Sequence, residues 1–188
     1  DAETGHRQYG PGQVCGDGVG VPADECAERR DEAGTMLGAE QEAWLAKGLA
    51  DNDTIWTVIA QQTVMFPLVL GDLVVNLDQW DGYVAARERL FDSIIDADQD
   101  NVVVLSGDIH AAGASDLFAE RGGERVPVAH ELVTTSISSL STTGELGPAV
   151  VSLVEPVTAH AAYVTAAAPG PARAPLHPTR CTLQRTPA

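Results

Sequence analysis

The sequence predicts an α/β fold, because two segments with helical periodicity are each followed by a short apolar strand. The clearer pair is an amphipathic helix over Val84–Ala97 and a buried strand over Asn101–Ser106. An earlier pair has the same order, with a helix over Gly38–Asp51 and a strand over Thr54–Gln62. Helices that alternate with strands are typical of helix-covered sheets, which bind ligands at the carboxyl ends of their strands.

The first helix–strand pair is supported by spacing and by composition. Trp44, Leu45 and Leu49 recur at helical spacing among good helix formers, and an Asp-Asn-Asp run closes the segment. The following strand is rich in β-branched and aromatic residues and is too short for a helix. It ends in two adjacent amides, Gln61 and Gln62, which alone are only a weak indication of a site.

The segment between the two pairs, Thr63–Asp81, predicts a long loop with apolar patches, because Pro67 and Gly71 interrupt it. In the second helix, apolar residues such as Leu90 form one face. Charged residues, among them Arg87, are expected on the opposite, polar face.

The rest of the chain gives weaker signals. Ala111–Gly123 predicts a short helix or a loop, and Arg125–Ile137 predicts another strand that runs into a Ser/Thr turn. We divide the chain into an irregular segment over 1–35, an α/β part over 36–147 and a poorly defined, Pro-rich tail over 148–188.

The composition excludes several classes of partner. The 188 residues are 44% hydrophobic and 20% charged, which is ordinary for a globular domain. The formal net charge of −16 has the wrong sign for charge-driven binding to nucleic acid or to an anionic membrane surface. An anionic substrate would be repelled unless a bound cation reversed the local field. If the protein handles phosphates, we expect it to do so through metal.

The cysteines and the apolar runs of the sequence indicate whether disulfides or membrane spans are expected. Cys15 and Cys26 lie in a Gly- and Asp-rich stretch without metal-ligand spacing, so we favour a local disulfide, with two free thiols as the alternative. Cys181 is left over. No membrane span is expected, because the best apolar run, Thr63–Leu77, is interrupted, and no signal-peptide pattern is present.

The most informative cluster follows the strand Asn101–Ser106, where Asp108 and His110 are two residues apart. On an extended chain, residues at that spacing point the same way. A carboxylate beside an imidazole suits either a metal ion or a carboxylate that orients a catalytic histidine. The alternative is that Asp108 caps a turn and His110 lies on its surface.

A second polar cluster, Asn76–Tyr83, contains Asp78, Trp80 and Asp81. Its carboxylates could ligate calcium, although a capped helix start at Asp81 explains much of the pattern. The sequence contains no serine-hydrolase elbow and neither of the glycine-rich phosphate-binding motifs.

Taken in chain order, several motifs resemble the PhoD-like alkaline phosphatases and phosphodiesterases of the metallophosphatase superfamily. They are Arg7–Tyr9, the following Cys-Gly-Asp-Gly, Leu37–Leu45, Trp56–Gln62, Asp78–Tyr83, Val103–His110 and Thr134–Ser138. Any one of them is weak, whereas their common order over much of the chain is specific.

The resemblance implies a metallophosphatase-like α/β/β/α sandwich and metal-dependent hydrolysis of phosphate mono- or diesters, with ferric iron and calcium as cofactors. It also implies a secreted, periplasmic or cell-wall location. By resemblance, Asp108 would be a metal ligand, and His110 a ligand or a catalytic contact to the phosphate. The rim of the site would consist of Gln61, Gln62, Asp78, Trp80 and Asp81.

The resemblance covers only the carboxyl-terminal half of the family's domain, to which 36–147 would correspond. Most metal ligands would then come from an upstream half, which becomes an expected partner. The alternative is a non-catalytic remnant, or a secreted binding or structural domain that keeps the fold without its metals.

Overall fold

The computed structural model describes Cys15, residues 19–135 and five short strands at 161–165, 172–173, 176–177, 180–181 and 184–185. The motif Arg7–Tyr9, the Ser/Thr turn after Thr135 and most of the Pro-rich tail lie outside the described residues. The division of the chain at 35 and 147 stays a prediction.

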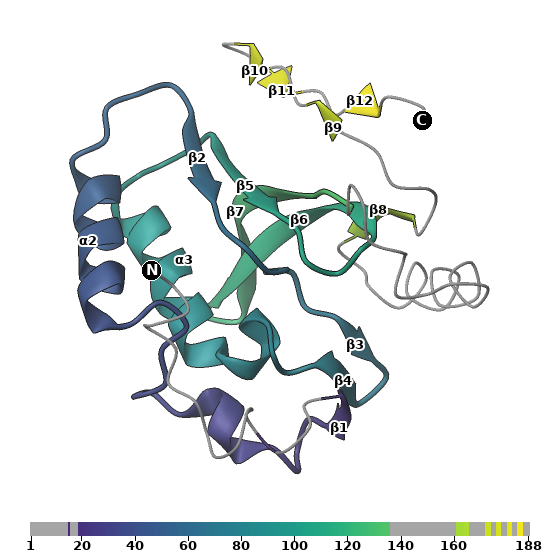
Figure 1. Ribbon diagram of the computed structural model, residues 1–188. Coiled ribbons are helices and arrows are strands. Elements are labelled where there is room, and N and C mark those ends of the chain that lie inside the picture. Colours follow the sequence, from purple (N-terminus) through teal and green to yellow (C-terminus); the bar gives the residue numbers. More distant parts are fainter. Residues whose placement is uncertain are drawn as a thin grey trace.

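The centre of the structure is a five-stranded sheet in the order β2-β5-β7-β6-β8 (Figure 1). Its strands are β2 (Thr57–Ala60), β5 (Val102–Ser106), β6 (Ala112–Arg121), β7 (Glu124–Val133) and β8 (Ala161–Thr165). β2, β5 and β7 run parallel, whereas β6 and β8 are antiparallel to their neighbours. The three parallel strands therefore end at the same edge of the sheet.

Two helices accompany this sheet, close to where the sequence predicts them. They are α2 (Ala39–Ala50) and α3 (Val84–Asp96). α3 packs against β6 and β7, and α2 packs against α3. The α/β class is confirmed, because parallel strands alternate with helices along the chain.

A smaller antiparallel sheet lies within and before the segment predicted to be a loop. It has the order β1-β4-β3, from β1 (Val19–Pro22), β3 (Val69–Leu70) and β4 (Leu73–Asn76). Two short 3-10 helices, η1 (Ala27–Arg30) and η2 (Trp80–Gly82), flank it. Four strands of two residues form two further pairs: β9 (Ala172–Arg173) with β12 (Gln184–Arg185), and β10 (Leu176–His177) with β11 (Arg180–Cys181). The prediction of a loop with apolar patches over Thr63–Asp81 is wrong where this stretch forms β3, β4 and the start of η2.

The prediction of a short helix or loop over Ala111–Gly123 is also wrong, since this stretch forms β6. The reason lies in the turn that follows: Gly122 and Gly123 both have positive φ, at 62° and 85°. A two-residue loop of this kind is the type I′ hairpin turn, which pairs β6 with β7 and leaves Arg121 opposite Glu124.

The core lies between α3 and the sheet and extends to the loops at the carboxyl edge. Its largest fully buried side chains include Phe66, Leu77, Trp80, Ile94 and Leu117. Arg87 differs from the expectation of a polar helix face, because its side chain is buried against Asp81, with 2.9 Å between Nη1 and Oδ1.

The amino-terminal segment is closed by a disulfide between Cys15 and Cys26, whose Cα atoms are 5.7 Å apart. A loop of this length restricts the unfolded chain and contributes roughly 3 kcal/mol in the chain-entropy account. In the part of the chain that the structure describes, no helix has the length and apolar character needed to cross a bilayer.

Two glycine substitutions test how tightly the η2 turn is packed. A Cβ on Gly82 would lie 1.9 Å from the carbonyl oxygen of Leu77, so we expect Gly82→Ala to lower the free energy of unfolding by about 1–3 kcal/mol. At Gly48 in α2 a Cβ would have no neighbour within 4 Å, and we expect Gly48→Ala to raise the free energy of unfolding by about 0.5–1 kcal/mol. Denaturant unfolding of both variants measures these changes; equal effects of the same sign would contradict the packing described.

Candidate active site

The carboxyl ends of β2, β5 and β7 are held together by backbone hydrogen bonds. The N–H of Gly107 donates to the carbonyl oxygen of Gln62 at 3.0 Å, and the N–H of Thr134 donates to that of Ser106 at 2.9 Å. A Cβ on Gly107 would lie 3.7 Å from the Gln62 oxygen and 3.8 Å from the Thr134 oxygen. Gln62, the turn after β5 and Thr134 are thus neighbours at the edge where α/β sheets bind ligands.

The turn that carries Asp108 and His110 has an uncommon backbone. Asp108 has a φ of 73° and His110 a φ of 54°, and the N–H of Ile109 donates to the oxygen of Gly107 at 2.9 Å. Positive φ costs a non-glycine residue on the order of 1–3 kcal/mol and is concentrated at functional sites. Because the chain is folded into a turn here, the expectation that strand geometry aligns the two side chains is wrong. Asp108 is exposed and His110 half-buried.

Beneath this turn lies the fully buried carboxylate of Glu131 on β7. Its two oxygens accept hydrogen bonds from the backbone N–H groups of Met65 at 2.8 Å and Phe66 at 2.7 Å. The hydroxyl of Ser106, the residue directly before Gly107, donates to the same carboxylate. Glu131 therefore fixes both the loop after β2 and the last residue of β5.

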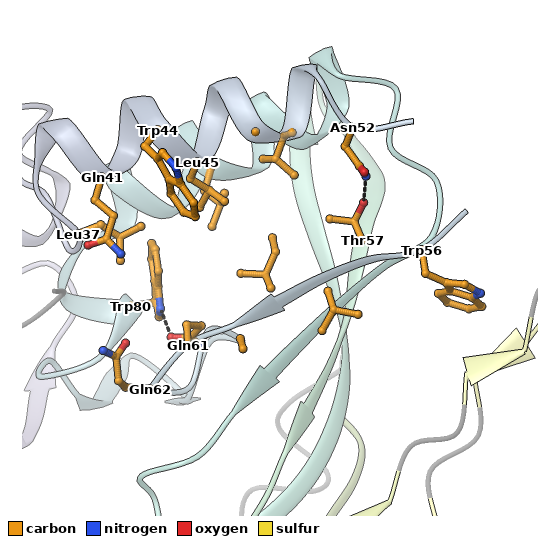
Figure 2. Close-up of a pocket in the computed structure, with 16 residues that line it drawn as sticks. Leu37, Gln41, Trp44, Leu45, Asn52, Trp56, Thr57, Gln61, Gln62 and Trp80 are labelled. Carbon is orange, nitrogen blue, oxygen red and sulfur yellow. Dashed lines mark hydrogen bonds between the residues drawn. The ribbon is translucent and has the colours of Figure 1, made fainter. Parts of the chain in front are cut away.

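Gln61 extends this network to β2. Its amide nitrogen donates to Ser106 Oγ, and its amide oxygen accepts the indole N–H of Trp80 at 3.0 Å (Figure 2). The amide nitrogen of Gln61 also donates to the carbonyl oxygen of Thr63, and its amide oxygen accepts the N–H of Thr63 at 3.1 Å. Gln61, directly after β2, thus connects the end of β2 to β5 and to η2 by side-chain hydrogen bonds.

The residues expected at the rim divide into two groups. Trp80 and Asp81 are each only 2% exposed, so the expectation that they line a rim is corrected. Asp81 is buried because its carboxylate pairs with Arg87 and accepts the N–H of Leu68 at 2.7 Å. Gln62 and Asp78 are exposed, and of these Gln62 is the one bonded to the Asp108 turn.

Burial raises the pKa of Glu131 above that of an ordinary carboxyl group. The Ser106 hydroxyl and the two backbone N–H donors oppose the rise, as does the positive charge of Arg87. The folded state therefore binds the Glu131 proton more tightly than the unfolded chain does.

Reasoning from the sequence did not identify Glu131, Ser106 or the buried role of Arg87. The one available signal was a glutamate that follows His130 inside the mostly apolar run Val126–Val133, since a buried charge needs specific partners. Those partners lie in other segments of the chain, and the sequence does not pair them.

The turn after β5 carries two side chains, Asp108 and His110, that are potential metal ligands. A carboxylate and an imidazole are suitable ligands for iron, and the carboxylate also suits calcium. Among the described residues, the one group of three or more potential ligands close enough to share an ion is Cys15, Cys26 and Glu28, and both of its sulfurs are used in the disulfide. Asp108 and His110 are suitable ligands by residue type, and among the described residues they belong to no group of three that could share an ion.

Glu131→Gln tests the buried carboxylate. We expect a loss of about 1–3 kcal/mol, because an amide nitrogen would face one of the backbone N–H donors. Wild-type stability falls as pH rises from the unfolded pKa towards the raised one, so this loss is larger at about pH 5 than at about pH 8. Urea unfolding measures it, with the exposed Glu124→Gln on the same strand as control. A loss that grows with pH would contradict the direction of the pKa shift.

Comparisons with known proteins agree on one family. A family model described as "PhoD-like phosphatase" matches residues 5–184. Alkaline phosphatase D from Bacillus subtilis (strain 168) is 40% identical over 138 residues, which cover 71% of this chain and 23% of that protein. A solved structure titled "Structure of PhoD" matches with a TM-score of 0.75 at 28% identity and covers 96% of this chain.

The chain spans 23% of the curated relative and 37% of the solved chain. The family model covers residues 5–184 of this chain, and the fold of this chain agrees with the matching part of the solved structure. The chain belongs to the PhoD-like phosphatase family.

Proposed function

We propose that this chain supplies the Asp108–His110 part of the active site of a metal-dependent phosphoesterase. The observation that carries the proposal is the turn at the carboxyl edge of three parallel strands. Its two chemically capable residues both have strained backbones, in a chain that belongs to a phosphatase family. The remaining ligands would come from polypeptide beyond these residues.

The proposed roles follow from donor type and exposure. Asp108 and His110 would hold the metal, for which we propose, from the family resemblance alone, ferric iron together with calcium. Bound metal supplies positive charge that offsets the charge of the phosphate and activates an oxygen nucleophile. If His110 is not itself a ligand, its imidazolium would donate a proton to the leaving-group oxygen, and the exposed amide of Gln62 would donate a hydrogen bond to a phosphate oxygen.

The charge of the chain supports a role for cations. At a net charge of −16, a phosphate mono- or diester is repelled until cations reverse the field near the turn. The Cys15–Cys26 disulfide supports a secreted, periplasmic or cell-wall location, since disulfides persist in oxidising compartments.

The second candidate is a non-catalytic domain that keeps the fold without its metals. The observation that favours it is the short donor set, because Asp108 and His110 are not part of any group of three potential ligands among the described residues.

Asp108→Asn separates the two candidates. The chain is co-expressed with the part of Bacillus subtilis alkaline phosphatase D that it does not match, and hydrolysis of p-nitrophenyl phosphate and of bis(p-nitrophenyl) phosphate is followed. We expect Asp108→Asn to lower kcat about 100-fold and to reduce the bound iron and calcium. The matched control is Asp100→Asn, an exposed carboxylate at the opposite end of β5.

Two results would contradict the proposal. If Asp108→Asn kept full activity and metal content, the non-catalytic candidate would be favoured. If the 188-residue chain alone hydrolysed both esters at the rate of the assembled protein, the site would not be partial.

A further inference from the structure

A pocket of about 410 Å³ is lined by residues of η1, α3 and β6, and none of its lining residues belongs to the turn after β5. Five arginines and four acidic residues line this pocket, whereas the whole chain has 11 basic and 27 acidic residues. The arginines are Arg29, Arg30, Arg87, Arg121 and Arg125. The pocket therefore gathers positive charge in a chain whose net charge is −16.

Most of the acidic residues of this arginine pocket are already paired. The pairs are Asp92 with Arg121, Glu120 with Arg125 and Asp116 with His130. The fourth acidic residue, Glu88, is exposed on α3. Among the described residues, neither Arg29 nor Arg30 has a carboxylate partner in an ion pair.

Arg29 is buried at the pocket with most of its hydrogen-bond donors unused. Its side chain is 6% exposed, and its one hydrogen bond to a described residue runs from Nε to the carbonyl oxygen of Asp81 at 3.0 Å. A guanidinium group has five N–H donors, so the donors on Nη1 and Nη2 have no acceptor among the described residues. Buried donors without a partner are costly, and such a group at a pocket indicates a ligand.

The charges around Arg29 favour an anion as that ligand. Burial lowers the pKa of Arg29. The charge of Asp81 opposes this shift, whereas the positive charges of Arg30 and Arg87 add to it. The three guanidinium groups are therefore close enough to repel one another. An anion bound among them would offset both the burial of the charge and the repulsion.

We propose that the arginine pocket binds a phosphate group at a position separate from the Asp108 turn. Planar guanidinium groups match the geometry of phosphate oxygens and bind them in pairs of hydrogen bonds. Three neighbouring guanidinium groups also favour a doubly charged phosphate over a singly charged carboxylate. The apolar lining residues Pro67, Phe91 and Phe118 provide contacts for an organic group, so a phosphate monoester is the expected form of the ligand.

The proposed site does not depend on hydrolysis, because none of its residues is assigned to the metal or to the reaction. It is connected to the candidate active site through Arg87, whose Nη1 donates to the carbonyl oxygen of Met65 at 2.9 Å. The N–H of Met65 donates to Glu131. The inference therefore goes beyond the proposed function and can be tested without it.

Isothermal titration calorimetry of the 188-residue chain tests the site after metals have been removed with EDTA and the EDTA has been dialysed away. Without cations, a phosphate has no metal to bind at the Asp108 turn. The probes are phenyl phosphate and inorganic phosphate, with benzoate as a singly charged control. We expect phenyl phosphate to bind at least about 10-fold more tightly than benzoate. Tighter binding of phenyl phosphate than of inorganic phosphate identifies an ester as the ligand, and the reverse order identifies free phosphate at the same site.

Two substitutions are expected to change the affinity for phenyl phosphate in opposite directions. Arg30→Gln removes an exposed positive charge of the pocket, and we expect it to weaken binding about 10-fold. Glu88→Gln removes a charge that repels the phosphate, and we expect it to strengthen binding about 2- to 5-fold. The matched controls are Lys47→Gln and Glu40→Gln, which change exposed residues of α2 outside the pocket and leave the affinity unchanged.

Four results would overturn the site: no binding of either phosphate, equal affinity for benzoate, unchanged affinity in Arg30→Gln, or loss of binding in Asp108→Asn. A fifth concerns a competing occupant. If the chain loses its affinity for phenyl phosphate when it is assembled with the part of Bacillus subtilis alkaline phosphatase D that it does not match, a protein segment fills the pocket instead. Full hydrolysis by Asp108→Asn contradicts the proposed function, whereas phosphate binding that depends on Arg30 still supports this site.

Discussion

The buried carboxylate of Glu131 is the constraint on which the rest of the structure depends. It binds the backbone of Met65 and Phe66, which follow β2, and the hydroxyl of Ser106, which ends β5. Gln61 connects the same hydroxyl to Trp80. One carboxyl group on β7 thereby connects the ends of β2, β5 and β7, and the Asp108 turn begins directly after Ser106.

Such a network is stable only when every donor and acceptor has a partner. A buried charge costs several kcal/mol, and each charge-assisted hydrogen bond returns about 1.5–3 kcal/mol. A buried ion pair between Arg87 and Asp81 lies beside this network, because Arg87 also donates to the carbonyl oxygen of Met65. This rigid base allows the Asp108 turn to keep two residues at positive φ, since surrounding contacts rather than local preference determine their conformation.

The sequence predicts the elements whose signals are local. The helices α2 and α3 and the strands β2, β5 and β7 follow from periodicity, and their order places Gln62 and Asp108 at one edge. Long-range partners are invisible to such reasoning, which is why Arg87 was expected on a polar surface and Asp81 at a rim. Glu131 accepts hydrogen bonds from Met65 and Phe66, which precede it by 66 and 65 positions in the sequence. β6 was missed because its evidence lies in the Gly122–Gly123 turn rather than in the strand itself.

The central claim is that Asp108 and His110 hold metal at the carboxyl edge of β2, β5 and β7. Anomalous diffraction at the iron edge from crystals of the assembled protein tests it most directly. The account predicts a peak about 2.0–2.6 Å from the Asp108 carboxylate and the His110 imidazole. A metal peak bound by other residues, with Asp108 and His110 outside coordination distance, would contradict it.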